Sequence, residues 1–293
     1  MKKINLCNIL LDILFVLISV MCIYPVLLVI GISFTDETAL ADFGFKVIPK
    51  VWSLGSYRYI VTAGNTILRA YGITAAVTII GAVSSTLVVA LYAYPLSRTD
   101  FAYRKLFMFM AFFTMLFSGG VVSWYMICTN VLHLKNSIWA MILPYIMNAW
   151  HVIVMRSFFT MSIPGAIIES AKIDGAGEWR IFFKLVMPLA VPGLATIGLF
   201  ATLTYWNDWT LPLYFVTEPK MYNLQFLLQS MISNIQMLTE NSALMGSTNL
   251  LADVPKEGAR MALCIIATGP ILIVYPFFQK YFIQGLTVGA VKE

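Results

Sequence analysis

Residues 169–193 read ESAKIDGAGEWRIFFKLVMPLAVPG, a polar segment inside a chain that is otherwise strongly apolar. Two acids and a lysine precede the glycines Gly175 and Gly177, and the segment then continues into an apolar run through Pro188 and Pro192. Glycine readily adopts the left-handed backbone angles that end a helix, and proline interrupts a helix interior. The stretch therefore predicts two short helices, the first starting at Pro164, joined by a glycine turn and hinged by proline to a longer apolar helix.

The composition of the whole chain places this segment in a membrane protein. Of the 293 residues, 60% are hydrophobic and only 11% are charged, whereas soluble domains carry about 25% charged residues. A helix needs roughly 20 apolar residues to cross the hydrocarbon core, and six stretches meet that length. We expect an all-α membrane protein with a single transmembrane domain, 1–293, and six spans at about 11–34, 71–96, 106–132, 137–156, 186–207 and 261–281.

The basic residues predict the orientation of these spans. With the N-terminus inside, eleven of the nineteen Lys and Arg residues fall on inner segments, and most of the others lie in the long outer loops 36–70 and 208–260. Positive charge concentrates on the cytoplasmic side of membrane proteins, and long loops count for little in this rule. Both termini are therefore expected in the cytoplasm, together with the loop 157–184 that carries the polar segment.

No catalytic or metal-binding pattern appears in the sequence. There is no G-x-x-x-x-G-K-[ST] phosphate loop and no G-x-S-x-G motif, and the four cysteines form no C-x-x-C pair. His133 and His151 have no carboxylate near them in the sequence. We therefore expect neither an enzyme nor a bound cofactor or metal in this chain, and any energy for its work has to come from a partner.

Within the polar segment, the pattern of acids, glycines and proline resembles the EAA motif of the permease subunits of ATP-binding cassette importers. That motif runs E-A-A, D-G-A, a later Phe, and Leu or Met before Pro; here Ser170 replaces the middle Ala, and Met187 stands where Leu is usual. The resemblance implies the type I importer permease fold, with the loop acting as a coupling helix that docks in a cleft of the ATPase. The coupling residues it implies are Glu169, Ser170, Ala171, Asp174, Gly175, Ala176, Phe182 and Pro188.

Other segments resemble the sugar-importer branch of that family, in particular permeases for oligosaccharides and polysaccharide fragments, including uronic-acid-containing ones. They are LFSGG at 116–120, MRSFF at 155–159 and GLTVGAVK at 285–292. The resemblance implies a bacterial plasma-membrane complex of two different permeases, two ATPase subunits that bind ATP and Mg, and an extracytoplasmic solute-binding protein. Residue spacing alone leaves other readings open: an inner loop held only by lipid headgroups, an ion-coupled carrier, or a membrane scaffold that transports nothing.

A second polar cluster ends the fifth predicted span. Aromatic faces suit the apolar side of a sugar ring, and amide or carboxylate groups suit its hydroxyls, so this cluster is a candidate contact on the substrate pathway. The alternative is an aromatic belt at the outer headgroup level. The cluster consists of Tyr205, Trp206, Asn207, Asp208 and Trp209.

Three smaller features carry expectations about packing. Small residues on the second span, Gly72, Ala76, Gly81 and Ser85, indicate close helix contact, with the other permease as one candidate partner. Asn148 and His151, three residues apart, are typical of a hydrogen-bonding site between helices, and Ser118-Gly119-Gly120 allows the third span to bend. Helical spacing of apolar residues from Leu224 to Leu238 predicts an amphipathic helix in the last outer loop.

Overall fold

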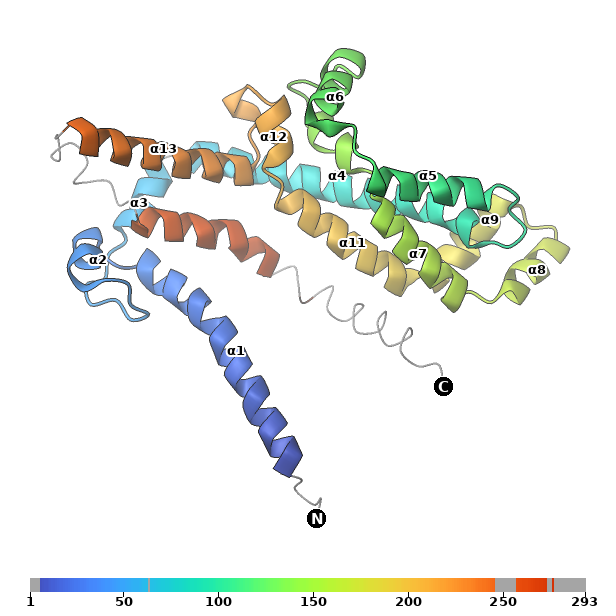
Figure 1. Ribbon diagram of the computed structural model, residues 1–293, viewed down its shortest axis with the longest axis horizontal. Coiled ribbons are helices and arrows are strands. Elements are labelled where there is room, and N and C mark those ends of the chain that lie inside the picture. Colours follow the sequence, from blue (N-terminus) through green and yellow to red (C-terminus); the bar gives the residue numbers. More distant parts are fainter. Residues whose placement is uncertain (1–5, 63, 246–256, 273–275, 277–293) are drawn as a thin grey trace. The chain divides into compact units, whose positions relative to one another are not determined.

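The structure is a computed structural model that describes residues 6–62, 64–245, 257–272 and 276 (Figure 1). Over these residues the ordered elements are helical, apart from one isolated bridge between Thr35 and Trp52. The predicted all-α class is therefore confirmed for the described part of the chain. Two compact units emerge, one drawn from Met1–Ile67 and Leu228–Pro270 and the other from Leu68–Leu227 and Ile271–Glu293.

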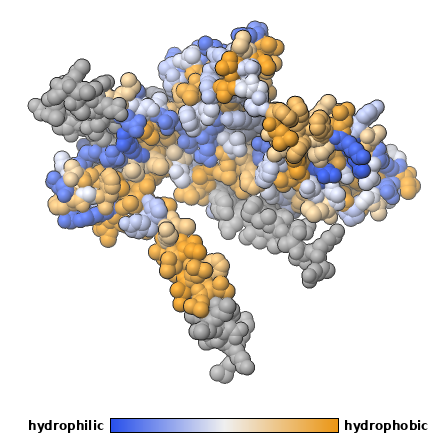
Figure 2. Space-filling view, in the orientation of Figure 1, coloured by the Kyte–Doolittle hydropathy of each residue, from blue (hydrophilic) through white to orange (hydrophobic). Residues whose placement is uncertain are grey.

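The first unit contains a long apolar helix with almost no protein around it. Helix α1 (Leu6–Ser33) is followed by the short helices α2 (Glu37–Phe43) and α3 (Gly55–Thr62). None of the most apolar window of Leu10–Ser33 is buried, and Figure 2 shows hydrophobic side chains along its surface. Such a helix is stable in hydrocarbon, where its backbone groups are satisfied internally and its side chains need no shielding from water.

A side chain of α2 caps a helix far along the sequence. Residues 257–272 are helical, and the Glu37 carboxylate accepts hydrogen bonds from the backbone N–H groups of Glu257 (3.0 Å) and Gly258 (3.2 Å). The first N–H groups of a helix have no partner within it, and a carboxylate is well suited to bind them. A side chain on Gly258 would collide with Ser56, so the glycine permits this close approach.

The second unit contains the long helix α4 and a series of shorter and broken helices. Those after α4 are mostly shorter than a membrane span and are interrupted by π-helical or 3₁₀ turns. The α-helices of this unit are α4 (Gly64–Ser97), α5 (Arg104–Leu116), α6 (Gly120–Met126), α7 (Ala149–Ser162), α8 (Gly165–Ile173), α9 (Glu178–Ile181), α10 (Met187–Leu189), α11 (Val191–Trp206), α12 (Thr210–Phe215) and the start of α13 (Leu224–Met245).

The described helices account for up to five membrane spans. Two are single helices, Leu10–Ser33 and Gly64–Ser97, and three are pairs bent at a short break by 117°, 53° and 82°. The 117° bend separates Arg104–Leu116 from Gly120–Val131, so the third predicted span is broken at the Ser118-Gly119-Gly120 stretch. The predicted sixth span, 261–281, is helical over 261–272, and most of its remainder lies outside the described residues.

The core of the second unit joins α4, α7 and the segment leading into α11. Its buried residues include Val89 and Ala93 of α4 and Met155 and Phe159 of α7, which meet Phe182 before α11. Figure 1 shows α7 beside α11. This packing holds the predicted inner loop against two of the long apolar helices.

The small face of α4 serves contacts within this chain. Ser85 and Thr78 are buried, and a Cβ atom on Gly81 would lie 2.7 Å from the Tyr205 ring of α11. Gly72, by contrast, has no atom within 4 Å of the corresponding position. The expected close helix contact is therefore present at Gly81, where its partner is α11 of the same chain.

The two glycines of α4 provide a matched test of this contact. Gly81→Ala is expected to lower the stability of the protein by about 1–3 kcal/mol, because the buried Tyr205 ring has to move. Gly72→Ala is expected to raise it by up to about 1 kcal/mol through helix propensity alone. Thermal unfolding of the two variants in detergent measures both effects, and equal shifts in the same direction would contradict the close contact.

Candidate functional site

The inner loop has the predicted helix–turn–helix geometry. Helix α8 ends in a Schellman motif: Ala176 N–H donates to the Ala171 carbonyl (2.9 Å) and Gly175 N–H to the Lys172 carbonyl (3.0 Å). Gly175 has the left-handed φ of +77° that this motif requires. Gly177 is instead extended and precedes α9, so the expected left-handed role falls on Gly175 alone, and α8 begins one residue after Pro164.

The predicted proline hinge follows the second short helix. Phe182–Val186 forms a π-helical turn and Met187–Leu189 a single helical turn before α11 begins at Val191. The helical segments on the two sides of this break differ in direction by 82°. Pro188 has no N–H to donate to the preceding turn, which accounts for the interruption. The loop is therefore hinged to α11 by a sharp bend next to proline, as predicted.

The residues of the motif divide into an exposed set and a packing set. Glu169, Ser170, Asp174, Gly175 and Pro188 are exposed, whereas Ala171 and Phe182 are buried and Ala176 is half-buried. Neither Glu169 nor Asp174 makes an ion pair within the described residues. Two large apolar side chains nearby are also exposed, Ile173 at 86% and Trp179 at 69%. The loop thus presents two unpaired acids beside apolar side chains, a surface suited to another protein.

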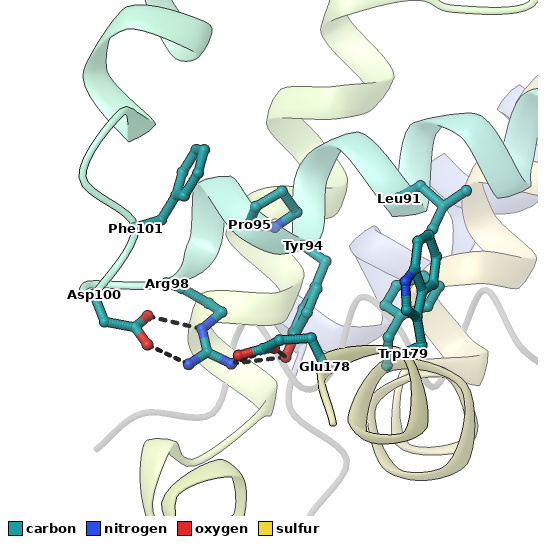
Figure 3. Close-up of a pocket in the computed structure, with 9 residues that line it drawn as sticks. Leu91, Tyr94, Pro95, Arg98, Asp100, Phe101, Glu178 and Trp179 are labelled. Atoms are coloured by element: carbon teal, nitrogen blue, oxygen red, sulfur yellow. Dashed lines mark hydrogen bonds and ion pairs between the residues drawn. The ribbon is translucent and has the colours of Figure 1, made fainter. Parts of the chain in front are cut away.

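The structure adds a group of charges around the loop that the sequence does not reveal. Arg98 and Asp100 follow α4, and they meet Lys172 of α8 and Glu178 of α9 in an alternating cluster, here named the inner ion ring. Figure 3 shows Arg98 between Asp100 and Glu178. Hydrogen bonds from Arg98 hold the pKa of Asp100 well below its usual range, and the bond to Asp100 raises the pKa of Lys172. Arg98, Asp100 and Lys172 are therefore charged together at neutral pH.

At the end of α11, the predicted outer cluster divides between packing and exposure. Tyr205 is buried and donates to the Ile142 carbonyl (2.9 Å), while Asn207 and Trp209 are exposed. The Trp206 ring lies 6.4 Å from that of Tyr71 of α4. The five residues therefore do not share one face.

Within this cluster, Asp208 is buried and acts as a helix cap. Its carboxylate accepts from the backbone N–H groups of Thr210 (3.1 Å) and Leu211 (3.3 Å) at the start of α12, and Tyr145 donates to it at 3.4 Å. Burial raises its pKa to about 6 in spite of these donors. These contacts give Asp208 a structural role irrespective of any ligand.

Asn148 has a similar role in the broken fourth span. Its side-chain oxygen accepts from the N–H groups of Trp150 (2.9 Å) and His151 (3.4 Å), so it caps α7. The His151 ring stacks on Phe200 of α11, with centroids 6.0 Å apart. The expected hydrogen-bonding site between helices is thus a cap and a ring contact instead.

Comparison with known proteins identifies the chain. The profile of the family described as "Binding-protein-dependent transport system inner membrane component" matches residues 87–288. The chain belongs to this family. It is thus a permease component of a binding-protein-dependent transport system, and the family consists of transport proteins that reside in the inner membrane.

Relatives of known name cover nearly the full length of this permease. It is 37% identical over 274 residues to the polygalacturonan/rhamnogalacturonan transport system permease protein YtcP of Bacillus subtilis (strain 168), covering 94% of each chain. It is 34% identical to protein LplC of the same organism, covering 94% of this chain and 91% of that one.

A solved structure supports the type I permease fold. It is the crystal structure of a bacterial ABC transporter involved in the import of the acidic polysaccharide alginate, and one of its chains aligns with a TM-score of 0.80 and 25% identity. The alignment covers 96% of this permease and 98% of that chain. The fold predicted from the sequence is therefore confirmed.

The cap formed by Asp208 predicts a pH dependence of stability. Because folding raises the pKa of Asp208 from the ordinary value near 4 to about 6, the folded state holds a proton that the unfolded chain releases. The contribution of Asp208 to stability is present below about pH 4 and falls as the pH rises to about 6. Asp208→Asn keeps the cap but has no titrating group, so its stability does not fall in this way as the pH rises.

Thermal unfolding in detergent from pH 4 to pH 7 tests this prediction. Asp208→Asn should become progressively more stable relative to the unmodified protein as the pH rises. Asp208→Ala, which lacks the cap, should be about 1 kcal/mol less stable than Asp208→Asn at every pH. Parallel pH profiles of Asp208→Asn and the unmodified protein would contradict the titration of this side chain.

Proposed function

We propose that this permease imports oligosaccharide fragments of acidic, uronate-containing polysaccharides. The observation that carries the proposal is the 37% identity, over 94% of both chains, to a permease named for polygalacturonan and rhamnogalacturonan transport. The structural likeness to a component of an alginate importer supports it further, because galacturonan and alginate are both polymers of uronic acids.

The proposed complex contains this chain, a second and different permease, two ATPase subunits that bind ATP and Mg, and an extracytoplasmic solute-binding protein. It lies in the bacterial plasma membrane with both termini of this chain in the cytoplasm, as the excess of basic residues on the inner segments supports. ATP hydrolysis belongs to the ATPase subunits, since this chain has no phosphate loop.

A transport assay on the reconstituted complex tests the substrate class. Oligogalacturonates of two to four units, loaded on the cognate binding protein, should stimulate ATP hydrolysis and enter proteoliposomes. Maltotriose and arabinotriose serve as neutral controls and should do neither. Stimulation by the neutral sugars alone would overturn the proposed class while leaving ATP-driven import intact.

We assign the coupling to the ATPase to the exposed half of the inner loop. Glu169 and Asp174 would meet cationic side chains of the ATPase cleft, and Gly175 would hold the turn between them. Ala171, Ala176 and Phe182 would support the loop from behind, with Ser170 at its surface and Pro188 at its hinge. The exposure of the two acids and the packing of the other set support this division.

Substitutions in the turn test the coupling assignment. Gly175→Leu places a branched side chain at φ +77°, where only glycine is unstrained, and should abolish ATP hydrolysis stimulated by the binding protein. Glu169→Lys reverses a charge that is expected to be buried at the ATPase interface, where breaking a pair costs about 3–5 kcal/mol. Co-purification with the ATPase and normal membrane insertion serve as controls, and normal import by both variants would refute the assignment.

The outer cluster is proposed to line the substrate pathway through its exposed members, Asn207 and Trp209, together with Trp206. The hydrogen-bonding capacity of Asn207 and the flat faces of the two tryptophans suit a sugar ring. Tyr205 and Asp208 would contribute indirectly, by fixing the end of α11 and the start of α12. An aromatic belt at the headgroup level is the alternative for the same residues.

A further inference from the structure

The inner ion ring is a closed cycle of four ion pairs. Arg98 forms a two-pronged pair with Asp100 through its Nε and its Nη2 atoms. Lys172 Nζ lies 2.9 Å from Asp100 and 3.1 Å from Glu178, and Arg98 closes the cycle at 3.3 Å from Glu178. Each charge thus lies between two of opposite sign, and Tyr94 of α4 also accepts from Arg98 (2.8 Å) and donates to Glu178 (3.3 Å).

The ring joins the segment after α4 to two neighbouring short helices that lie 72 to 80 residues further along the sequence. Arg98 and Asp100 lie directly after α4, whereas Lys172 lies in the last turn of α8 and Glu178 in the first turn of α9. Lys172 and Glu178 therefore hold the two sides of the Gly175 turn, and the ring ties both sides to one end of a long apolar helix.

Side-chain packing around the ring is incomplete on two sides. A cavity of about 370 Å³ is lined by Arg98, Asp100 and Glu178 together with Trp179 (Figure 3). A second cavity of about 260 Å³ is lined by Arg98, Asp100 and Lys172. The ion pairs therefore add, at the partly open edge of the core, to the apolar contact of Tyr94 with Phe182 that also connects the end of α4 to the inner loop.

The four side chains differ in how far they are fixed. The Arg98 side chain is only 11% exposed, whereas those of Asp100 and Glu178 are about half exposed. Exposed ion pairs stabilise a fold very little when isolated, but a network with one buried and two-pronged arginine defines geometry. The ring is therefore better suited to fixing a position than to stabilising the whole fold.

We propose that Arg98, Asp100, Lys172 and Glu178 are positioning residues that fasten the inner loop to α4, so that movement of the loop reaches α4 as well as α11. The inference rests on the proposed coupling role of the loop. Without the ring, the loop still packs on α4 through Phe182 and continues into α11 through the proline hinge, but its Gly175 turn is no longer fixed to the end of α4. Part of the force from the ATPase would then move the turn alone and would not reach α4.

Lysine substitutions in the reconstituted complex test the ring. Lys172→Met removes two of the four ion pairs, Lys172→Arg retains the charge, and Lys184→Met is a matched control, because Lys184 is exposed and has no ion pair within the described residues. Import per ATP hydrolysed should fall about fivefold or more in Lys172→Met. It should stay within twofold of the unmodified complex in Lys172→Arg and Lys184→Met. An unchanged ratio in Lys172→Met would overturn the proposal.

A covalent link between the segment after α4 and α8 provides a rescue experiment. A purely structural role of the ring would not explain a recovery of import per ATP. Asp100→Cys and Lys172→Cys are combined after the four native cysteines have been replaced by serine. The pair should show the low import per ATP of an opened ring. Joining the two thiols with a short bifunctional methanethiosulfonate should restore the ratio, and loss of import on cross-linking would show that the ring has to open during transport.

A measurement without substrate separates this proposal from the proposed function. Hydrogen exchange of the backbone amides in 98–103 and 165–178 of the purified complex should speed up at least about fivefold in Lys172→Met, because local opening becomes easier. Unchanged exchange in Lys172→Met would refute the proposed role of the inner ion ring, whatever the import per ATP of that variant. If exchange is faster in Lys172→Met but the unmodified complex imports none of the glycans tested, the inner ion ring does fasten the loop. The proposed substrate class is then overturned.

Discussion

Hydrocarbon provides no water to a peptide group, and this constraint governs every break in the long apolar segments of the permease. A straight helix satisfies its own backbone, but three of the apolar segments change direction by 53° to 117°. At these breaks the freed N–H groups need other partners. Asn148 provides one at the start of α7, and the Ser118 hydroxyl accepts from the Gly120 N–H at the start of α6. The polar residues in and beside the apolar segments therefore make the breaks possible.

The need to satisfy backbone polar groups also explains the geometry of the inner loop. The Schellman turn at Gly175 satisfies the carbonyls at the end of α8, so the loop needs no further partner for its backbone. Its acids remain free on one side, while Phe182 and Ala171 anchor the other side in the core between α4 and α7. A short segment can thus be rigid in itself and still present charge to a second protein.

Much of this architecture could be predicted from local sequence. The glycine turn and the proline hinge depend on backbone angles that few other residues adopt. The long apolar segments can be recognised by their length. The inner ion ring could not be predicted, because Arg98 and Glu178 are 80 residues apart and no local pattern links them. The buried side of α11 could not be predicted either. The sequence of a helix that is apolar on every side does not indicate that Tyr205 is buried and Asn207 exposed.

The bond between Glu37 and the amides of Glu257 and Gly258 has a consequence for biosynthesis. The carboxylate and its donors are separated by 220 residues, so a ribosome synthesises all of Leu68–Leu227 before the cap can form. Most of the second unit can thus fold during translation, whereas α2 receives this bond only after a late segment has been made. Helix α2 is therefore synthesised early but is among the last elements of the permease to acquire its final contacts.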